Sequence, residues 1–377
     1  MRVAAIDIGT VTSRLLVADV DASGVRQVAR QSAITNLGEG VDASGELLPE
    51  AIDRTVAQVA EYRKVIDACA ADCTVDRVVA LATSASRDAR NADVFVSRLR
   101  EVGVELSVIP GEREAALSFL GASNDFRNED LLFADIGGGS TEMVFGRASG
   151  SAGDLVPDVA VRASHSFNIG CRRMTERFLA GDPPTKDELA AASAWAHETL
   201  APFFEVGNSC DRLVAVAGTP TSVVAVRDTL VPYDSSRVHG ARVTRAEFDE
   251  VAERMWTLPL AERMKVAGIQ PKRAGIFPAG LVILGAVMDL ANLDGFTVSE
   301  SDILIGIVLD AARSALLEAP VNCRAPCAQC SEHGACCRGC WLERCVWFYG
   351  RTSWGVSMEP IAANRAHVRR LAILKTL

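Results

Sequence analysis

One segment, residues 131–142, restricts the possible folds more than any other part of the chain. Its first four residues are apolar, as in a buried strand, and that strand ends at Asp135. Glycines without a Cβ atom allow backbone N–H groups to approach an anion, and hydroxyls add donors. Two flanking acids, Asp135 and Glu142, suit a divalent metal shared with phosphate. The segment predicts a strand and then a phosphate-binding loop made of Gly137, Gly138, Gly139, Ser140 and Thr141.

A shorter copy of this pattern lies at the N-terminus. An apolar run at residues 3–8 contains Asp7, and a second strand is expected over residues 14–20. Asp7 and Asp135 are 128 residues apart, and the same order of strand, acid, glycine and hydroxyl surrounds each. The duplication predicts two similar halves that face one phosphate chain. The phosphate-binding residues expected in the first half are Gly9, Thr10, Thr12 and Ser13.

The composition is that of an ordinary globular enzyme. The chain has 377 residues, of which 49% are hydrophobic and 23% charged, and this length favours two domains. No apolar stretch reaches the roughly 18–20 residues that span a bilayer. Met1 and Arg2 lead directly into the first strand, so no signal peptide is expected. The expected location is the cytoplasm, with no membrane partner.

The net charge of −9 is unevenly distributed. Residues 320–377 contain eight Lys and Arg against three Asp and Glu, so this segment carries +5 and the rest of the chain −14. An acidic body argues against broad nucleic-acid binding, and we expect no nucleic-acid partner. A polyanionic substrate would need local arginines and a metal ion to enter such a protein.

Apolar periodicity and turn residues predict alternating strands and helices in both halves. In the first half, strands are expected at 3–8, 14–20, 25–31, 77–82 and 105–109, and helices at about 48–69, 91–100 and 111–121. In the second half, strands are expected at 131–136, 141–147, 159–167, 212–217 and 296–298, and helices at 171–179, 186–200, from 219, 277–290 and 302–317. Thr185 and Glu188 have the spacing of a capping box. This order indicates two α/β domains with mixed sheets.

Several sequence blocks in a fixed order resemble one enzyme family. They occupy residues 7–10, 82–87, 111–116, 135–142, 167–171, 217–221 and 273–280. The chain resembles the exopolyphosphatase/guanosine pentaphosphate phosphohydrolase family, within the actin/Hsp70/sugar-kinase superfamily, from residue 1 to about 316. A glycine-rich loop alone would be weak evidence, because sugar kinases and Hsp70-like ATPases share it. The number and order of the blocks make the resemblance specific.

The resemblance implies two ribonuclease-H-like (actin-like ATPase) domains with the active site in the cleft between them. Phosphatase domain I would comprise residues 1–124, with 299–318 packing back on it, and phosphatase domain II residues 125–298. Residues 319–377 would be a cysteine-rich tail with a basic C-terminal helix. The resemblance also suggests a homodimer.

The resemblance also assigns roles to single residues. Glu114 matches the general base that orients or deprotonates water. The alternative is a structural role, because an acid in the first turn of a helix interacts favourably with the helix dipole. Arg87 matches the arginine that binds phosphate, and Asp7, Asp135 and Glu142 match the acids of the Mg²⁺ site and phosphate loops. Gly218 and Thr219 open a helix and either bind phosphate or form an ordinary N-cap. Arg273 is a further candidate for the opposite wall. Val11 replaces an Asn that family members usually have, which removes one hydrogen bond near the phosphates.

Seven of the eleven cysteines lie between residues 323 and 345. Cys327, Cys330, Cys337 and Cys340 form two CxxC pairs, as in a compact zinc knuckle or an iron–sulfur site. Metal binding by Zn²⁺ or an iron–sulfur cluster is the favoured interpretation, and disulfides or free thiols are the alternative. The family resemblance says nothing about this segment.

The predicted function is Mg²⁺-dependent hydrolysis of the terminal phosphoanhydride bond of inorganic polyphosphate, with release of orthophosphate. Guanosine pentaphosphate 5′-phosphohydrolase is the first alternative. A non-catalytic sensor of polyphosphate or of an alarmone is the second, and the presence of Glu114 favours an enzyme over it. A sugar kinase would need a sugar-binding block, and no block in this chain matches one.

Overall fold

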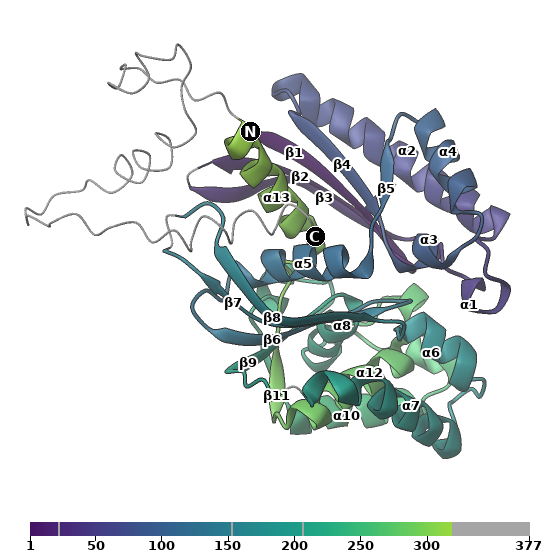
Figure 1. Cartoon of the computed structure of the whole chain (residues 1–377). Helices are drawn as coiled ribbons and strands as arrows, with labels where there is room; N and C mark the ends of the chain where they lie inside the picture. Colours follow the sequence, from purple (N-terminus) through teal and green to yellow (C-terminus); the bar gives the residue numbers. More distant parts are fainter. Residues whose placement is uncertain (22, 152–153, 206, 319–377) are drawn as a thin grey trace, which may run out of the picture. The chain divides into compact units, whose positions relative to one another are not determined.

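Two β-sheets organise the part of the chain that the computed structural model describes, residues 1–318 apart from 22, 152–153 and 206 (Figure 1). Residues Met1–Arg313, which contain both sheets, form one compact unit. The predicted ligands Cys327, Cys330, Cys337 and Cys340, and the basic segment after them, lie outside the described residues. Their metal binding therefore stays a prediction.

The first sheet is built from five strands in the order β3-β2-β1-β4-β5. Three consecutive strands pair antiparallel, and the last two run parallel to β1. β1 is buried along its whole length, because helices cover both faces of the sheet. The strands are β1 (Arg2–Ile8), β2 (Thr12–Asp21), β3 (Gly24–Ile34), β4 (Arg77–Ala82) and β5 (Leu106–Val108).

The second sheet repeats this topology with one additional strand. Its order is β10-β11-β9-β6-β7-β8, so β6, β7, β8, β9 and β11 correspond to β1 to β5. The additional strand β10 pairs antiparallel with β11 at the edge. The duplication predicted from two short motifs therefore extends to whole sheets. The strands are β6 (Asp130–Ile136), β7 (Thr141–Ser149), β8 (Asp158–Phe167), β9 (Arg212–Val216), β10 (Arg242–Thr244) and β11 (Gly295–Val298).

Helices on opposite faces bury the first sheet. One face packs on α2 and α4 through side chains such as Val59 and Phe95, and the other packs on α13 through Leu304 and Ile307. We call this sheet and its helices the first lobe. Its helices are α1 (Val41–Ser44), α2 (Pro49–Asp72), α3 (Ser84–Asp88), α4 (Ala92–Glu101) and the returning α13 (Ile303–Glu318).

The second lobe contains the second sheet and a larger apolar core. Its central helix, α12, buries nearly every side chain from Phe277 to Met288, and the other helices surround it. The helices of this lobe are α6 (Cys171–Phe178), α7 (Lys186–Phe204), α8 (Gly218–Arg227), α9 (Ser235–Val238), α10 (Arg245–Thr257), α11 (Leu260–Arg263), the 3₁₀ turn η1 (Pro271–Arg273) and α12 (Phe277–Ala291).

Helix α5 (Gly111–Ser123) joins the two lobes. Its Phe119 packs against Phe133 and Val144 of the second sheet, whereas Leu117 packs in the cluster that contains α13. Helices α5 and α13 approach closely because glycines face the partner backbone. A Cβ atom on Gly121 would lie 2.0 Å from the Asp302 carbonyl oxygen, and one on Gly306 would lie 1.9 Å from that of Leu117.

The mixed α/β fold with two related sheets agrees with the fold class predicted from the sequence. The capping box of Thr185 and Glu188 is present at the start of α7. Helix α10 and strand β10 were not predicted, although Thr244 and Glu247 form a second capping box. The expected domain boundary at residue 124 stays a prediction.

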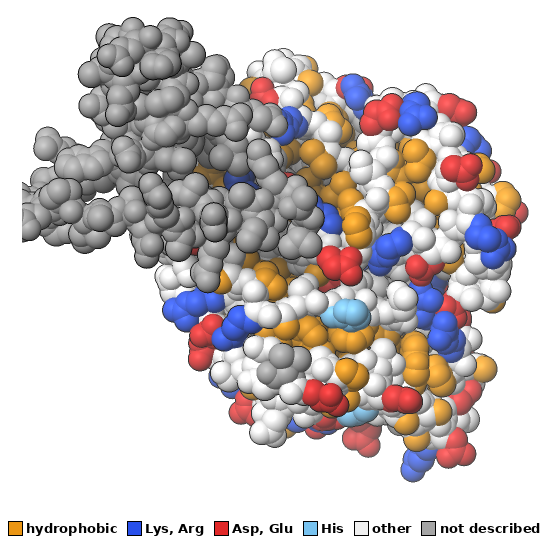
Figure 2. Space-filling view, in the orientation of Figure 1, with side chains coloured by type: hydrophobic (Ala, Val, Ile, Leu, Met, Phe, Trp, Pro, Cys, Tyr) orange, Lys and Arg blue, Asp and Glu red, His pale blue; other side chains and the backbone are white. Residues whose placement is uncertain are grey.

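The surface of the described residues mixes polar and apolar side chains. Figure 2 shows acidic and basic side chains interspersed on one face, with hydrophobic side chains between them. Among the helices of the described residues, none is long and apolar enough to cross a membrane.

Two helical glycines provide a test of the α5–α13 contact. Gly306→Ala should lower the free energy of unfolding by about 1–3 kcal/mol, because its methyl group would overlap the backbone of α5. Gly285→Ala in α12 is the matched control, since its Cβ atom would meet Phe248 at an ordinary 3.5 Å. We expect that variant to be unchanged or up to about 1 kcal/mol more stable. Urea denaturation measures both, and equal effects would contradict the packing described.

Candidate active site

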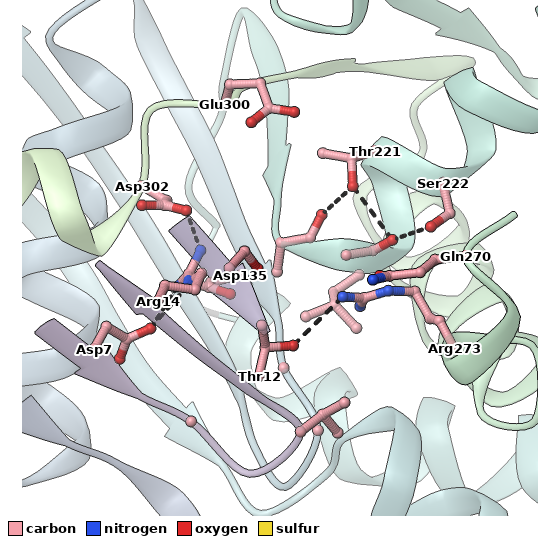
Figure 3. A pocket seen from close by; sticks show the side chains of 18 of the residues that line it. Asp7, Thr12, Arg14, Asp135, Thr221, Ser222, Gln270, Arg273, Glu300 and Asp302 are labelled. Atoms are coloured by element: carbon pink, nitrogen blue, oxygen red, sulfur yellow. Dashed lines mark hydrogen bonds and ion pairs between the residues drawn. The ribbon is translucent and has the colours of Figure 1, made fainter. Parts of the chain in front are cut away.

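A cavity of about 720 Å³ lies between the two lobes and receives side chains from both (Figure 3). Two turns form opposite walls of the cavity: one joins β1 to β2, and the other joins β6 to β7. Residues predicted from the sequence that line it are Asp7, Gly9, Thr10, Thr12, Glu114, Asp135, Gly137, Gly138, Gly139, Ser140, Glu142 and Gly218, together with Arg273. The structure therefore brings together acids and glycines that are far apart in the sequence.

The two turns share a backbone hydrogen bond between equivalent residues. The Gly137 N–H donates to the Ser140 carbonyl at 3.0 Å, and the Gly9 N–H donates to the Thr12 carbonyl at 3.0 Å. In the second turn, helix α6 holds the carbonyl side of the loop: the Cys171 and Arg172 N–H groups donate to Gly137 and Gly138, each at 2.9 Å.

Three consecutive N–H groups of the β6–β7 turn are available to a ligand. Among the described residues, no atom accepts a hydrogen bond from the N–H groups of Gly138, Gly139 and Ser140. These residues line the cavity. Consecutive free N–H groups at a cavity wall suit an anion.

Glycine is required in this loop because the two lobes meet there. A Cβ atom on Gly138 would lie 2.5 Å from Val11 Cγ2, and one on Gly139 would lie 2.5 Å from Ser84 Oγ and 2.7 Å from Thr10 Oγ1. A side chain at Gly138 or Gly139 would clash with residues of the first lobe. Val11 is thus a packing residue beneath the second loop, and its side chain is buried.

Three buried carboxylates at this cavity, those of Glu114, Asp135 and Glu142, repel one another. Burial raises the pKa of Glu114 to about 8, and the Arg87 guanidinium, which donates to Glu114 at 3.0 Å, opposes that rise. Burial likewise raises the pKa of Asp135 to about 6, against the effect of Arg14. The pKa of Glu142 is raised well above its usual value, first by burial and then by the charges of Glu114 and Asp135. Excess negative charge in a dry site favours binding of a proton or a cation.

Each of the three acids has a hydrogen bond that orients it. Ser118 Oγ donates to Asp135 at 2.9 Å, and Ser166 Oγ donates to Glu142 at 2.7 Å. Ser166 lies under the start of α5, where a Cβ atom on Gly111 would be 2.4 Å from its Cβ. The helix that carries Glu114 therefore packs on β8, whose Ser166 holds Glu142.

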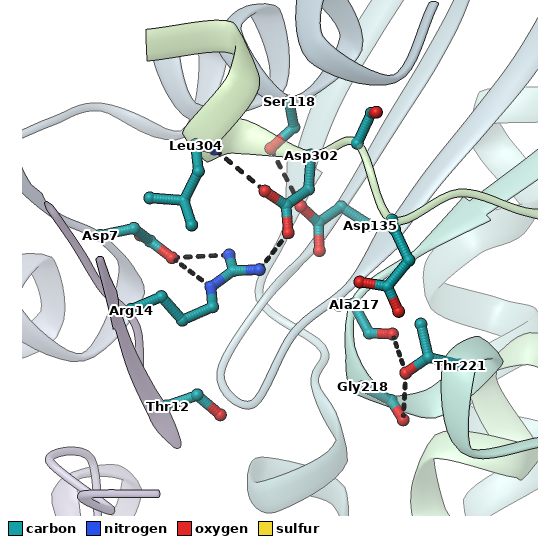
Figure 4. A network of polar contacts seen from close by, with 12 residues as sticks. Asp7, Thr12, Arg14, Ser118, Asp135, Ala217, Gly218, Thr221, Asp302 and Leu304 are labelled. Atoms are coloured by element: carbon teal, nitrogen blue, oxygen red, sulfur yellow. Dashed lines mark hydrogen bonds and ion pairs between the residues drawn. The ribbon is translucent and has the colours of Figure 1, made fainter. Parts of the chain in front are cut away.

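Asp7 has a different environment, because a guanidinium already neutralises it (Figure 4). Arg14 Nε and Nη2 donate to Asp7 Oδ2 at 3.0 and 2.6 Å, and Arg14 also forms an ion pair with Asp302. Asp302 Oδ1 in turn accepts the Leu304 N–H at the start of α13, at 3.0 Å. Asp7 thus links β1 to the returning helix through one partly buried arginine.

Four residues predicted to form the site do not line the cavity: Ser13, Arg87, Thr141 and Thr219. Arg87 donates to Glu114 and to the Ile109 carbonyl, at 3.0 and 3.1 Å, instead of facing the cavity. Ser13 Oγ is hydrogen-bonded to Thr35 Oγ1 at 2.9 Å, and Thr141 Oγ1 donates to the Ile169 carbonyl at 2.6 Å. Thr219 is buried against α12, where a Cβ atom on Gly280 would lie 2.2 Å from its hydroxyl. The geometry gives these four structural contacts.

Arg273 is a partly buried cation at the cavity wall. Its Nη2 donates to Thr12 Oγ1 at 3.4 Å (Figure 3), and no described carboxylate forms an ion pair with it. Burial lowers its pKa, as expected for a charge that lacks a partner. Its guanidinium lies against Gly218 at the start of α8, where a Cβ atom would be 1.4 Å from Nη1. A partly buried cation beside a helix N-terminus suits an anion.

The acids at the cavity suit a magnesium ion only in part. Mg²⁺ takes one or two carboxylates and completes its shell with waters and phosphate oxygens. Asp135 and Glu142 fit that requirement, since both are buried, line the cavity and repel each other. Asp7 fits it poorly, because a second cation would be repelled by Arg14. Over the described residues, no group of three or more metal-ligating side chains is preassembled.

The duplicated sheets and the glycine loops on an acidic cavity define a class of α/β proteins that bind phosphate between two lobes. The model of the Ppx/GppA phosphatase family matches residues 16–315, and the chain belongs to that family. Exopolyphosphatase 2 of Mycobacterium tuberculosis is 37% identical over 329 residues, covering 82% of this chain and 98% of that protein.

Solved structures show the same relationship. A crystal structure of an exopolyphosphatase-like protein is 35% identical, with a TM-score of 0.75, and the match covers 84% of this chain and 98% of that one. The Aquifex aeolicus member of the Ppx/GppA family is 31% identical, with a TM-score of 0.68, over 83% of this chain and 98% of that one. The family resemblance seen in the sequence is confirmed.

Neutralising Glu142 should stabilise the metal-free protein. The pKa of Glu142 is higher in the folded than in the unfolded chain, so folding is penalised increasingly as the pH rises above the unfolded value. In EDTA at pH 8, Glu142→Gln should raise the free energy of unfolding by about 1 kcal/mol or more, and near pH 4 the gain should vanish.

Glu112→Gln is the matched control for this measurement. Glu112 is exposed on the same helix as Glu114, and its replacement should change stability by less than about 0.5 kcal/mol. Thermal unfolding at several pH values measures both variants. A Glu142→Gln variant that is less stable than wild type at pH 8 would contradict the charge repulsion described.

Proposed function

We propose that this chain hydrolyses the terminal phosphoanhydride bond of inorganic polyphosphate and releases orthophosphate. The observation that carries the proposal is the position of Glu114, a buried acid that faces a cavity walled by two phosphate-type loops. Similarity to exopolyphosphatase 2 of Mycobacterium tuberculosis supports this choice of substrate.

The loops and Arg273 would bind the anionic chain end. The N–H groups of Gly138, Gly139 and Ser140 are available for oxygens of the terminal phosphate, and the hydroxyls of Thr10 and Thr12 line the opposite wall. Arg273 would neutralise the next part of the chain, since it lies at the wall and pairs with no carboxylate of the described residues. Phosphoryl transfer depends mainly on such positioning and charge stabilisation.

Glu114 would accept a proton from the attacking water. Its pKa of about 8 lies near neutral pH, which suits a general base better than an exposed glutamate does. Arg87 would act through Glu114: the hydrogen bond at 3.0 Å fixes the carboxylate and keeps a fraction of it ionised. This role differs from direct phosphate binding, which the family resemblance implied for Arg87.

Mg²⁺ would be held by Asp135 and Glu142 and by phosphate oxygens. Bound there, it would neutralise the acids and the charge of the transferred group. Ser118 and Ser166 would orient the two carboxylates toward it through their hydrogen bonds. Asp7 would instead keep Arg14 in place.

Guanosine pentaphosphate is a second candidate substrate. The cavity continues beyond Arg273 to Val231, Pro232 and Tyr233, and Tyr233 is half-exposed. An aromatic and apolar surface next to a phosphate site suits a nucleoside. A comparison of the two substrates decides between them.

Removing the proposed base should abolish turnover. Glu114→Gln should lower kcat for orthophosphate release from long-chain polyphosphate, with Mg²⁺, by about 100-fold or more. Glu112→Gln, on the same helix but exposed, should keep wild-type kcat. Parallel assays with guanosine pentaphosphate identify the preferred substrate. Full activity of Glu114→Gln would contradict the assignment, and no release from either substrate by wild type would refute the proposed function.

The ion pair with Arg87 should set the pH dependence. Because Glu114 must be ionised to accept a proton, log(kcat/KM) should fall as the pH falls through its pKa. Arg87 lowers that pKa, so Arg87→Met should move the acidic limb to higher pH by about one unit. The control is Arg90→Met, which removes an exposed arginine paired with Glu46 and should leave the limb in place. Identical limbs in wild type and Arg87→Met would contradict this role.

A further inference from the structure

One arginine outside the cavity lining ties the second phosphate loop to the first lobe. Arg173 lies in α6, and its three guanidinium nitrogens contact three different elements. Nε donates to the Gly139 carbonyl at 2.9 Å, while Nη1 and Nη2 form ion pairs with Asp42 of α1 and Asp88 of α3. The side chain is only 12% exposed, so these contacts are made in a partly dry environment.

The contact with Gly139 involves a peptide whose N–H group is among those proposed to bind phosphate. The Gly139 carbonyl and the Ser140 N–H belong to one planar unit, so fixing the oxygen also fixes the direction of the N–H. The carbonyls of Gly137 and Gly138 are held by α6 backbone N–H groups from within the second lobe. Gly139 is instead held by a side chain that is anchored in the first lobe.

The anchor in the first lobe is connected to the proposed base. Asp88 is the last residue of α3, and the same short helix carries Ser84, which lies against Gly139, and Arg87, which holds Glu114. Figure 1 shows α6 of the second lobe facing α1 and α3 of the first. Arg173 thus links the phosphate loop to the helix that orients the base.

Neighbouring arginines do not make this link. Arg172 bonds Asn36 and Glu176, and Arg177 bonds Asp42 with a side chain that is 43% exposed. Within the described residues, neither side chain donates a hydrogen bond to the loop. Arg177 shares a carboxylate with Arg173 but lacks its contacts with Gly139 and Asp88, so it is a natural control.

We propose that Arg173 is a positioning residue that holds the Gly139–Ser140 peptide in its phosphate-binding orientation through its contacts with both lobes. The inference rests on the proposed function and adds a specific residue to it. A guanidinium is suited to this task, because its planar fork directs three separate nitrogens to three partners, whereas a lysine has a single nitrogen. Loss of these contacts allows the peptide to rotate away from the transferred phosphate.

The expected effect is on kcat more than on KM. Small misplacements of groups that stabilise a transition state cost up to about 100-fold in rate. Arg173→Met should therefore lower kcat by about 10- to 100-fold, with KM changed by less than about 3-fold, since the rest of the loop and Arg273 still bind the chain. Arg173→Lys should restore only part of kcat.

The experiment measures orthophosphate release from polyphosphate with Mg²⁺ for wild type, Arg173→Met, Arg173→Lys, Asp88→Asn and Arg177→Met, with the thermal midpoint of each. Assays are run well below the lowest midpoint. Arg177→Met should keep wild-type kcat, and Asp88→Asn, which leaves the contacts of Arg173 with Asp42 and Gly139, should lower kcat less than Arg173→Met does. If Arg173→Met does not fold, Arg173→Lys and Asp88→Asn carry the test.

The possible failures are distinguishable. If wild type is active and Arg173→Met has a lower midpoint but full kcat, the arginine is only structural and the inference is overturned. An equal loss of kcat in Arg177→Met and Arg173→Met would also overturn it, because the common partner Asp42 would then be responsible. A wild type that releases no orthophosphate refutes the proposed function instead.

Discussion

The contact between the two hairpin turns is the constraint on which the remaining structure depends. Gly138 and Gly139 lie so close to Thr10, Val11 and Ser84 that no Cβ atom fits between them. This approach brings two loops 128 residues apart in the sequence to one cavity. The twofold repetition of the sheet order places both turns at equivalent strand ends, so duplicating one supersecondary unit produces both walls.

Packing the two lobes together has an electrostatic cost that two partly buried arginines reduce. Asp7, Glu114, Asp135 and Glu142 all lose solvent in the same cavity, and unpaired buried carboxylates are strongly unfavourable. Arg14 neutralises Asp7, and Arg87 pairs with Glu114. Asp135 and Glu142 have only serine donors, which leaves a site whose charge would be balanced by a cation. The protein thus keeps its negative charge where a metal and a phosphate would meet.

Much of this fold was predictable because its signals are local. Apolar runs mark the strands, and a strand–glycine–hydroxyl pattern marks each turn, so two related α/β halves followed from the sequence. The alternation of side chains along a strand explains part of what was misplaced. Thr12 lines the cavity, and therefore Ser13, the next residue of β2, points to the other face, where it meets Thr35.

Pairings between distant residues could not be predicted. Arg14 and Asp302 are 288 positions apart, and nothing local indicates that they form an ion pair. Arg87 was expected at the phosphate because an isolated arginine carries no sign of its partner, whereas the structure gives it Glu114. Helix α10 is not among the predicted helices, although its Thr244–Glu247 capping box is a local signal for the start of a helix.

The central claim is that water attacks a terminal phosphate held between the two loops. The most direct measurement is hydrolysis of polyphosphate in H₂¹⁸O by the wild-type protein with Mg²⁺, followed by mass spectrometry of the products. If water attacks the terminal phosphorus, we expect one ¹⁸O atom in each orthophosphate released and none in the shortened chain. Label in the remaining chain, or release of unlabelled orthophosphate, would contradict attack of water at the terminal phosphorus.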